Sequence, residues 1–84
     1  MDVRIEYCRP CGLLPAAEEA EHAILEELGQ YIDVLRFVPG HGGVFKVSLN
    51  GDVVFDNEHD PWDLGIVVDR VRQRLTGSPS REGG

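Results

Sequence analysis

The sequence predicts an α/β fold with the element order β-α-β-β-β-α, in which a four-stranded mixed sheet is covered by two helices. Three observations carry this prediction. Apolar residues alternate over residues 2–7, they recur at helical spacing after residue 16, and an Asn-Gly pair at 50–51 separates two apolar runs. A chain of 84 residues has room for one domain. We expect that domain to span residues 1–76 and residues 77–84 to form a disordered tail.

The first half of the chain predicts a strand, a break and a helix. Val3, Ile5 and Tyr7 fall on one side of a strand over residues 2–7. Residues 8–15 form a break that contains two prolines. From residue 16 to the stop at Gly29, four apolar residues at spacings of three, four and four predict one buried helical face: Ala17, Ala20, Ile24 and Leu28.

The second half predicts three strands and a helix. Residues 32–38 are rich in apolar and β-branched residues, and Pro39-Gly40 should close that strand. Residues 44–49 and 53–55 flank Asn50-Gly51, the typical signal of a hairpin. Asp60 is then the expected cap of a second helix, with Pro61 in its first turn. The apolar spacing from Leu64 to Leu75 indicates that one face of this helix is buried.

The connections between these elements predict the sheet topology. A crossover through the first helix makes the first two strands parallel neighbours, and the hairpin makes the last two antiparallel. We therefore expect the first strand to be central, paired to the second and the third.

The charge balance argues against several classes of partner. Fifteen acidic and eight basic residues give a net charge of −7. Nucleic-acid binding needs clustered cations, and the only basic cluster, Arg70, Arg72 and Arg74, is explained by the C-terminal end of a helix. The longest stretch without a charged residue is nine residues, so we expect no membrane span. We expect a soluble cytoplasmic protein that is a monomer. A single lysine beside so many acids predicts a salt-adapted, halophilic or GC-rich source.

Two cysteines, Cys8 and Cys11, follow the first strand as a Cys-x-x-Cys motif. This motif at a strand-to-helix junction is typical of a thioredoxin-like redox unit. Such chemistry needs a thiolate, and Arg9 between the cysteines, together with a helix N-terminus, would stabilise one. Pro15 complicates the helix argument. Because it has no backbone N–H, a helix running straight from Pro10 would leave the carbonyl of Cys11 without its usual hydrogen-bond donor. Either the first turn is separate or the helix is kinked there.

Three longer segments resemble the selenoprotein W family, also called the Rdx family. They are residues 3–12 with the Cys-x-x-Cys motif, residues 39–47 (Pro-Gly-His-Gly-Gly-Val-Phe-Lys-Val) and residues 49–55 (Leu-Asn-Gly-Asp-Val-Val-Phe). The resemblance covers about residues 2–75 in order. It implies a thioredoxin-like fold and a thiol-based redox role. Selenoprotein members carry selenocysteine at the position of Cys11, so a cysteine there implies slower chemistry.

Two arguments disagree on which cysteine is the attacking thiol. In thioredoxin-like proteins the first cysteine is exposed at the strand end and the second lies behind it, which favours Cys8 as the attacking thiol. The position of selenium in the relatives favours Cys11. We expect Cys8 to attack. His41, in a glycine-flanked loop, and Pro10 and Arg9 are candidate modulators of the pair, although a solvated loop histidine is the simpler interpretation of His41.

The function expected from these residues is that of a small thiol–disulfide redox protein. Its partners would be protein thiols and disulfides or low-molecular-weight thiols, with no cofactor. A non-catalytic interaction module, gated by the thiols and using the glycine-rich loop, is the alternative. A metal site is a weaker hypothesis, because His22, His41 and His59 lack metal-ligand spacing. Trp62 is either a docking anchor or, more simply, a packed aromatic at the rim of the core.

Overall fold

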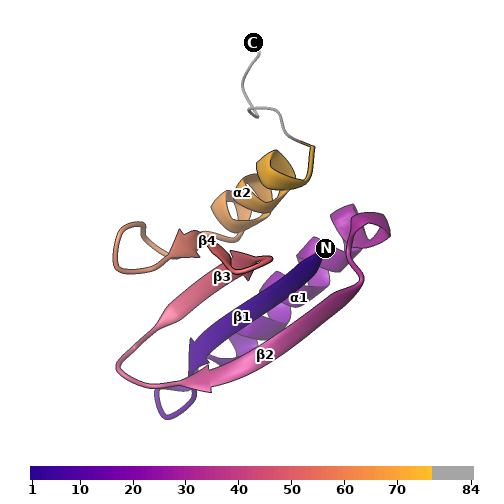
Figure 1. Cartoon of the computed structure of the whole chain (residues 1–84). Coiled ribbons are helices and arrows are strands. Elements are labelled where there is room, and N and C mark those ends of the chain that lie inside the picture. Colours follow the sequence, from indigo (N-terminus) through magenta and orange to yellow (C-terminus); the bar gives the residue numbers. More distant parts are fainter. Residues whose placement is uncertain (77–84) are drawn as a thin grey trace.

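The computed structural model describes residues 1–76, so the tail expected at residues 77–84 lies outside the described residues. The elements follow the predicted order (Figure 1). They are β1 (Asp2–Cys8), α1 (Leu14–Leu28), the short 3-10 helix η1 (Gly29–Tyr31), β2 (Val34–Gly40), β3 (Phe45–Leu49), β4 (Asp52–Asp56) and α2 (Leu64–Thr76). Within this part of the chain, neither helix combines the length and the apolar character needed to cross a membrane.

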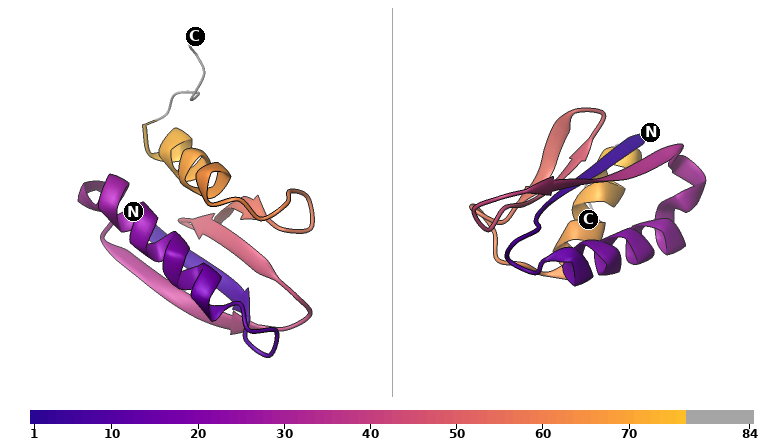
Figure 2. Two further views of the ribbon diagram at one scale, coloured as in Figure 1. Left: turned by 180° about the vertical axis from the view of Figure 1, so that it is seen from behind. Right: turned by 90° about the horizontal axis from the view of Figure 1, so that it is seen from below.

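The four strands form one mixed sheet in the order β2-β1-β3-β4. β1 is parallel to β2 and antiparallel to β3, and β3 is antiparallel to β4. The predicted central position of β1 is therefore confirmed. Both helices lie on the same face of the sheet (Figure 2). Residues 1–76 consequently form two layers, and no helix among them covers the opposite face of the sheet.

The core lies between the sheet and the helices, where the alternation of β1 directs apolar side chains. Val3 and Ile5 are fully buried, and Tyr7 is nearly so, with its ring 5.8 Å from that of Phe37. Burying a side chain of the size of Ile5 contributes about 1.5–3 kcal/mol. The helix α1 buries the four residues that its spacing indicated: Ala17, Ala20, Ile24 and Leu28.

The hairpin between β3 and β4 has the geometry that Asn50-Gly51 predicts. Asn50 has φ of 50° and Gly51 has φ of 90°, as a type I′ turn requires. The pairing shifts between Val47 and Ser48, so β4 contains a bulge. As a result Val54 and Phe55, although adjacent, are both buried.

Several boundaries differ by one to four residues from the sequence expectation, and two of the differences have a clear physical reason. β2 does not stop before Pro39-Gly40 but includes both residues. Because β2 is an edge strand, a proline without an N–H is tolerated there. The helix α2 begins at Leu64, and Asp63 caps it by accepting a hydrogen bond of 2.8 Å from the N–H of Gly65. The expected cap, Asp60, instead pairs with Arg70 at 3.1 Å.

Candidate functional site

The cysteine pair lies in a turn between β1 and α1. Residues 9–12 form this turn, which the N–H of Gly12 closes by donating to the carbonyl of Arg9 at 3.2 Å. Gly12 has φ of 77°, a value that favours glycine. The turn is thus separate from α1, which starts at Leu14 rather than at residue 16. Pro15 lies in the first turn of α1, where its missing N–H breaks no helical hydrogen bond.

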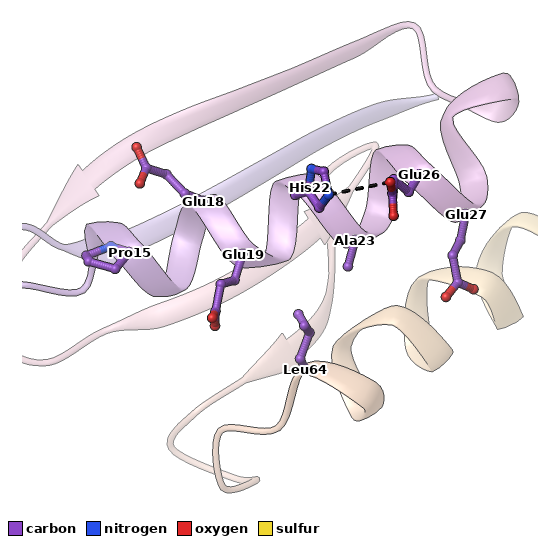
Figure 3. Close-up of a pocket in the computed structure, with 8 residues that line it drawn as sticks. All are labelled: Pro15, Glu18, Glu19, His22, Ala23, Glu26, Glu27 and Leu64. Carbon is purple, nitrogen blue, oxygen red and sulfur yellow. Dashed lines mark ion pairs between the residues drawn. The ribbon is translucent and has the colours of Figure 1, made fainter.

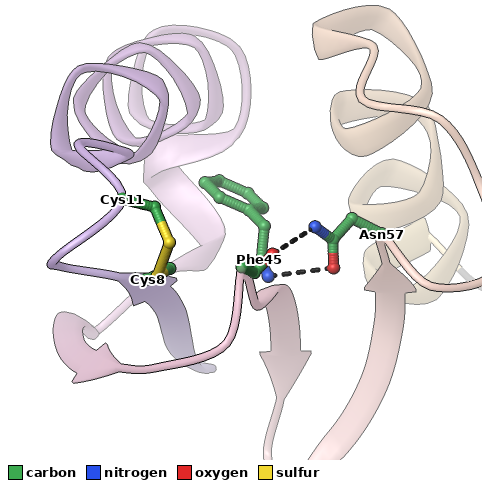
Figure 4. The surroundings of a disulfide bond; sticks show 5 residues. Cys8, Cys11, Phe45 and Asn57 are labelled. Atoms are coloured by element: carbon green, nitrogen blue, oxygen red, sulfur yellow. Dashed lines mark hydrogen bonds between the residues drawn. A yellow bond between two sulfur atoms is a disulfide. The ribbon is translucent and has the colours of Figure 1, made fainter.

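The sulfur atoms of Cys8 and Cys11 are joined as a disulfide in the structure, with the two Cα atoms 5.4 Å apart (Figure 4). Cys8 is fully buried, whereas Cys11 is exposed. The expectation that Cys8 is the accessible member of the pair is therefore wrong. Cys8 is the last residue of the central strand, and its N–H donates to the carbonyl of Val44 at 2.8 Å. Neighbouring chain covers it on both sides, and the turn carries Cys11 outward.

The loop between β2 and β3 lies directly beside Cys8. The N–H of Arg9 donates to the carbonyl of Gly40 at 3.1 Å. A Cβ added to Gly40 would lie 2.7 Å from Cγ1 of Val44 and 3.0 Å from Oε2 of Glu6. The loop can therefore approach the end of β1 only because residue 40 has no side chain.

The candidate modulators lie around this turn and loop without strong contacts to one another. Arg9 and Pro10 are exposed on the turn. His41 is exposed on the adjacent loop, and in the described part of the chain it makes no hydrogen bond or ion pair. Arg9 likewise has no ion-pair partner within residues 1–76, so its charge is free to act on the cysteines. A modulating role for each of these residues stays a prediction.

Asn57 is a residue of the site that sequence reasoning missed. Its side chain donates to the carbonyl of Gly43 at 2.7 Å and accepts from the N–H of Phe45 at 3.0 Å (Figure 4). Both bonds fix the residues on either side of Val44, the hydrogen-bond partner of Cys8. One asparagine after a strand is too common a signal to be singled out in a sequence.

An apolar hollow of about 130 Å³ opens beside the site. It is lined by Leu13, Ala16, Phe45, Asn57 and Trp62. The Trp62 ring packs on those of Phe45 and Phe55, with centroids 4.7 Å and 6.2 Å apart. The side chain is nevertheless 40% exposed. Trp62 is thus a packed rim aromatic that also presents apolar surface to solvent.

A larger cavity of about 530 Å³ lies away from the cysteines, between α1 and the start of α2 (Figure 3). Glutamates dominate its lining, and His22 lies 3.5 Å from Glu26 there. Within residues 1–76 no three His, Cys, Asp or Glu side chains are grouped closely enough to hold a metal ion. The lining of this cavity also contains no cysteine, so the cavity is separate from the cysteine pair.

The fold has one layer of mixed sheet and one of helices, and a Cys-x-x-Cys turn follows the internal strand β1. This arrangement is typical of a thioredoxin-like protein. Residues 2–73 match the model of the Rdx family. The chain belongs to the Rdx family, as the sequence motifs predicted.

Individual relatives agree with this assignment. The mouse protein Migration and invasion enhancer 1 is 30% identical over 78 residues, covering 89% of this chain and 65% of the relative. The bovine protein of the same name is 29% identical over 79 residues, with the same coverage. The chain thus spans just under two thirds of the length of these relatives.

Two crystal structures have the same fold. One, of a protein from Bordetella parapertussis, superposes with a TM-score of 0.80 at 31% identity and covers 87% of this chain and 95% of its own. The other, a selenoprotein W-related protein from Vibrio cholerae, has a TM-score of 0.81 at 21% identity, with coverage of 88% and 95%. At that lower identity the similarity shows the fold alone.

Proposed function

We propose that the protein is a thiol–disulfide redox protein that reduces disulfides or oxidised thiols through Cys8 and Cys11. One observation carries the proposal: the two sulfurs lie at bonding distance, and only one member of the pair is exposed. Membership of the Rdx family supports it.

The difference in exposure between the two cysteines supports a different role for each. Exchange begins when a thiolate attacks a sulfur that it can reach, so access governs which cysteine meets the substrate. Cys11 is the reachable sulfur, and it therefore attacks the substrate in the reduced protein. Cys8, buried beneath it, then resolves the mixed disulfide. This order reverses the one expected from general thioredoxin-like geometry and agrees with the position of selenium in the resembling selenoproteins.

The surroundings of Cys11 favour its thiolate. Arg9 places a cation two residues away, and the N-terminal end of α1 begins three residues later at Leu14. The first turn of this helix carries no acidic residue that would oppose a negative charge. A lowered thiol pKa at Cys11 is the consequence we propose.

The experiment is alkylation of the reduced protein from pH 5 to 9, with each cysteine followed separately by mass. Cys11 should be labelled first, and its labelling should persist at lower pH than that of Cys8. Arg9→Ala should shift the Cys11 profile to higher pH, whereas Arg36→Ala, on an exposed strand position, should not. Slow and equal labelling of both cysteines at pH 7 would contradict the redox proposal.

Turnover separates this function from that of an interaction module. With a dithiol reductant in excess, a redox enzyme reduces many equivalents of a disulfide per molecule, and a module reacts once. Cys11→Ser should abolish turnover. Reduced Cys8→Ser, mixed with the disulfide after the reductant has been removed, should stop at a stable mixed disulfide, which identifies Cys11 as the attacking residue. A single stoichiometric reaction by the unmodified protein would favour the module.

A further inference from the structure

Two residues that line the apolar hollow are connected to Cys8 through main-chain hydrogen bonds. The N–H of Leu13 donates to the carbonyl of Cys8 at 3.3 Å. Phe45 directly follows Val44, whose carbonyl accepts the N–H of Cys8 at 2.8 Å. Two walls of the hollow are thus tied to the end of β1, and Figure 4 shows the Phe45 side chain between the disulfide and Asn57. The hollow therefore opens beside the reactive pair.

The lining of the hollow suits an uncharged apolar side chain. Trp62, Phe45 and Leu13 contribute ring and methyl surface, and Ala16 leaves space between them. The amide of Asn57 is already occupied, because its nitrogen and oxygen bond to Gly43 and Phe45. The side-chain polar groups of the lining are this amide and the Trp62 indole N–H, and the other three lining side chains are apolar. A volume of about 130 Å³ corresponds to one side chain of moderate size.

The segment that carries Trp62 is acidic, and this bears on what can occupy the hollow. Residues 56–63 contain four carboxylates and no lysine or arginine, and within residues 1–76 only Asp60 among them is paired with an arginine, Arg70. The remaining carboxylates are Asp56, Glu58 and Asp63. An anionic small thiol such as glutathione is repelled by this segment, whereas a basic polypeptide is attracted to it.

We propose that the hollow is a substrate subsite, which binds an apolar side chain of a polypeptide next to the cysteine that reacts with Cys11. This inference rests on the proposed function and names its substrate class. The favoured substrate is a disulfide-containing polypeptide with an apolar residue beside its cysteine and basic residues nearby. Seating that side chain against Trp62 holds the substrate sulfur close to the exposed Cys11.

The reaction at this subsite is a two-electron exchange. The Cys11 thiolate attacks one sulfur of the substrate disulfide, so that a bond to Cys11 forms, the substrate S–S bond breaks and the leaving thiolate takes up a proton. The Cys8 thiolate then attacks the sulfur of Cys11 and releases the second substrate thiol. The substrate is reduced and the Cys8–Cys11 disulfide is formed. A dithiol donor returns the pair to its reduced state by the same exchange.

The test compares peptide disulfides that differ at one residue beside the cysteine. The residue beside the cysteine is leucine or serine, and the residue after it is lysine or glutamate. Dithiothreitol supplies the electrons. Hydroxyethyl disulfide, small and uncharged, reports chemistry that does not use the hollow. The protein should prefer the leucine peptide by about tenfold or more in kcat/KM. Lysine should be preferred to glutamate, and salt should reduce that preference.

Three variants locate the preference in the hollow. Trp62→Ala should remove the leucine preference, lowering kcat/KM for the leucine peptide far more than the rate with hydroxyethyl disulfide. Ala16→Leu, which fills the hollow without removing an aromatic, should do the same and covers the case in which Trp62→Ala does not fold. Tyr31→Ala, at a similarly exposed aromatic in η1, just beyond the C-terminal end of α1, should keep the preference.

Each contrary result identifies what is wrong. Equal rates for the leucine and serine peptides, with hydroxyethyl disulfide still reduced, would overturn the subsite and leave the proposed function standing. Oxidised glutathione reduced as fast as the leucine peptide would assign the site to small thiols instead. Loss of a dimer on Trp62→Ala would assign the hollow to a second copy of the chain. If no disulfide is reduced, the proposed function itself fails and the subsite with it.

Discussion

Asn57 and Phe45 are joined by hydrogen bonds in both directions. The side-chain oxygen of Asn57 accepts from the N–H of Phe45, and the N–H of Asn57 donates to the carbonyl of Phe45, each at 3.0 Å. Together with the bond to Gly43, these contacts hold the segment after β4 against the start of β3. The carbonyl of Val44 lies between the two fixed residues and is the group that receives the N–H of Cys8. Asn57 therefore positions the turn region without touching either sulfur.

Replacing Asn57 with alanine should destabilise the fold by about 1–3 kcal/mol, because partly buried main-chain groups lose their partners. Asn57→Asp keeps the oxygen that accepts from Phe45 but puts a carboxylate against the carbonyl of Gly43, so it should be destabilised as well. Urea unfolding measures both variants. If both had the stability of the unmodified protein, these hydrogen bonds would contribute nothing to the fold.

Gly40→Ala should destabilise the fold by about 1–3 kcal/mol, because the new methyl group overlaps the Val44 side chain at 2.7 Å. Gly29→Ala is the matched control, since no atom lies within 4 Å of its added Cβ and its φ of −56° suits any residue. That control should be neutral or slightly stabilising. Adding Val44→Ala to Gly40→Ala should recover part of the loss. Equal effects at both glycines would show that close approach is not what requires Gly40.

The melting temperature should rise from low salt to molar KCl. A net charge of −7 repels itself, and salt screens that repulsion. Exposed ion pairs such as Arg74 with Asp52, at 2.8 Å, are screened too, but such pairs contribute little. The control is the double variant Glu18→Gln with Glu19→Gln, which removes two exposed negative charges from α1 and should show a smaller rise. A melting temperature that stays flat or falls would remove the idea of salt adaptation.

The stability of the protein should show a small acid-dependent contribution from Asp33. The ammonium group of Met1 donates to its carboxylate at 2.6 Å, and this hydrogen bond, assisted by the positive charge, lowers the pKa of Asp33 below its ordinary value of 3.8. A lowered pKa in the folded state means that the contribution is fully present above the ordinary value and is lost as the pH falls through the lowered one.

Asp33→Asn should accordingly unfold at slightly lower urea at neutral pH, and the difference should disappear in acid. Asp63 is not a suitable control because it caps α2, so Glu19→Gln on the exposed side of α1 serves instead. A difference between Asp33→Asn and the unmodified protein that persists at low pH would mean that the ion pair is not its cause.

Much of the fold follows from local patterns, because each pattern reports on a physical requirement that the chain meets by itself. The alternation of Val3 and Ile5 and the Asn50-Gly51 turn predicted their elements correctly. The boundaries that were missed depend on neighbours. Pro39 can stay in a strand only because β2 is at the edge of the sheet, which a local pattern does not reveal.

The sequence was sufficient to predict the residue types of the candidate site, but not which of its two cysteines is exposed. The spacing of Cys8 and Cys11 was sufficient to expect a pair that can form a disulfide. Which of the two is buried depends on Val44, a residue far along the chain, and on how the turn ends before Leu14. The position of Asn57 and the hollow beside Trp62 are likewise products of tertiary packing. Only the assembled structure brings those residues together.

The central place of β1 also sets the order in which the molecule can assemble. β1 is the first strand to be synthesised, yet its register partners are in β2 and in β3, where Val3 lies opposite Leu49. The hairpin of β3 and β4 needs only neighbouring residues, whereas β1 must wait for most of the chain, because closing long loops is slow. Until the segment around Val44, just before β3, has docked, Cys8 lacks the neighbour that accepts its N–H. A newly made chain therefore presents two exposed cysteines, and folding buries one of them.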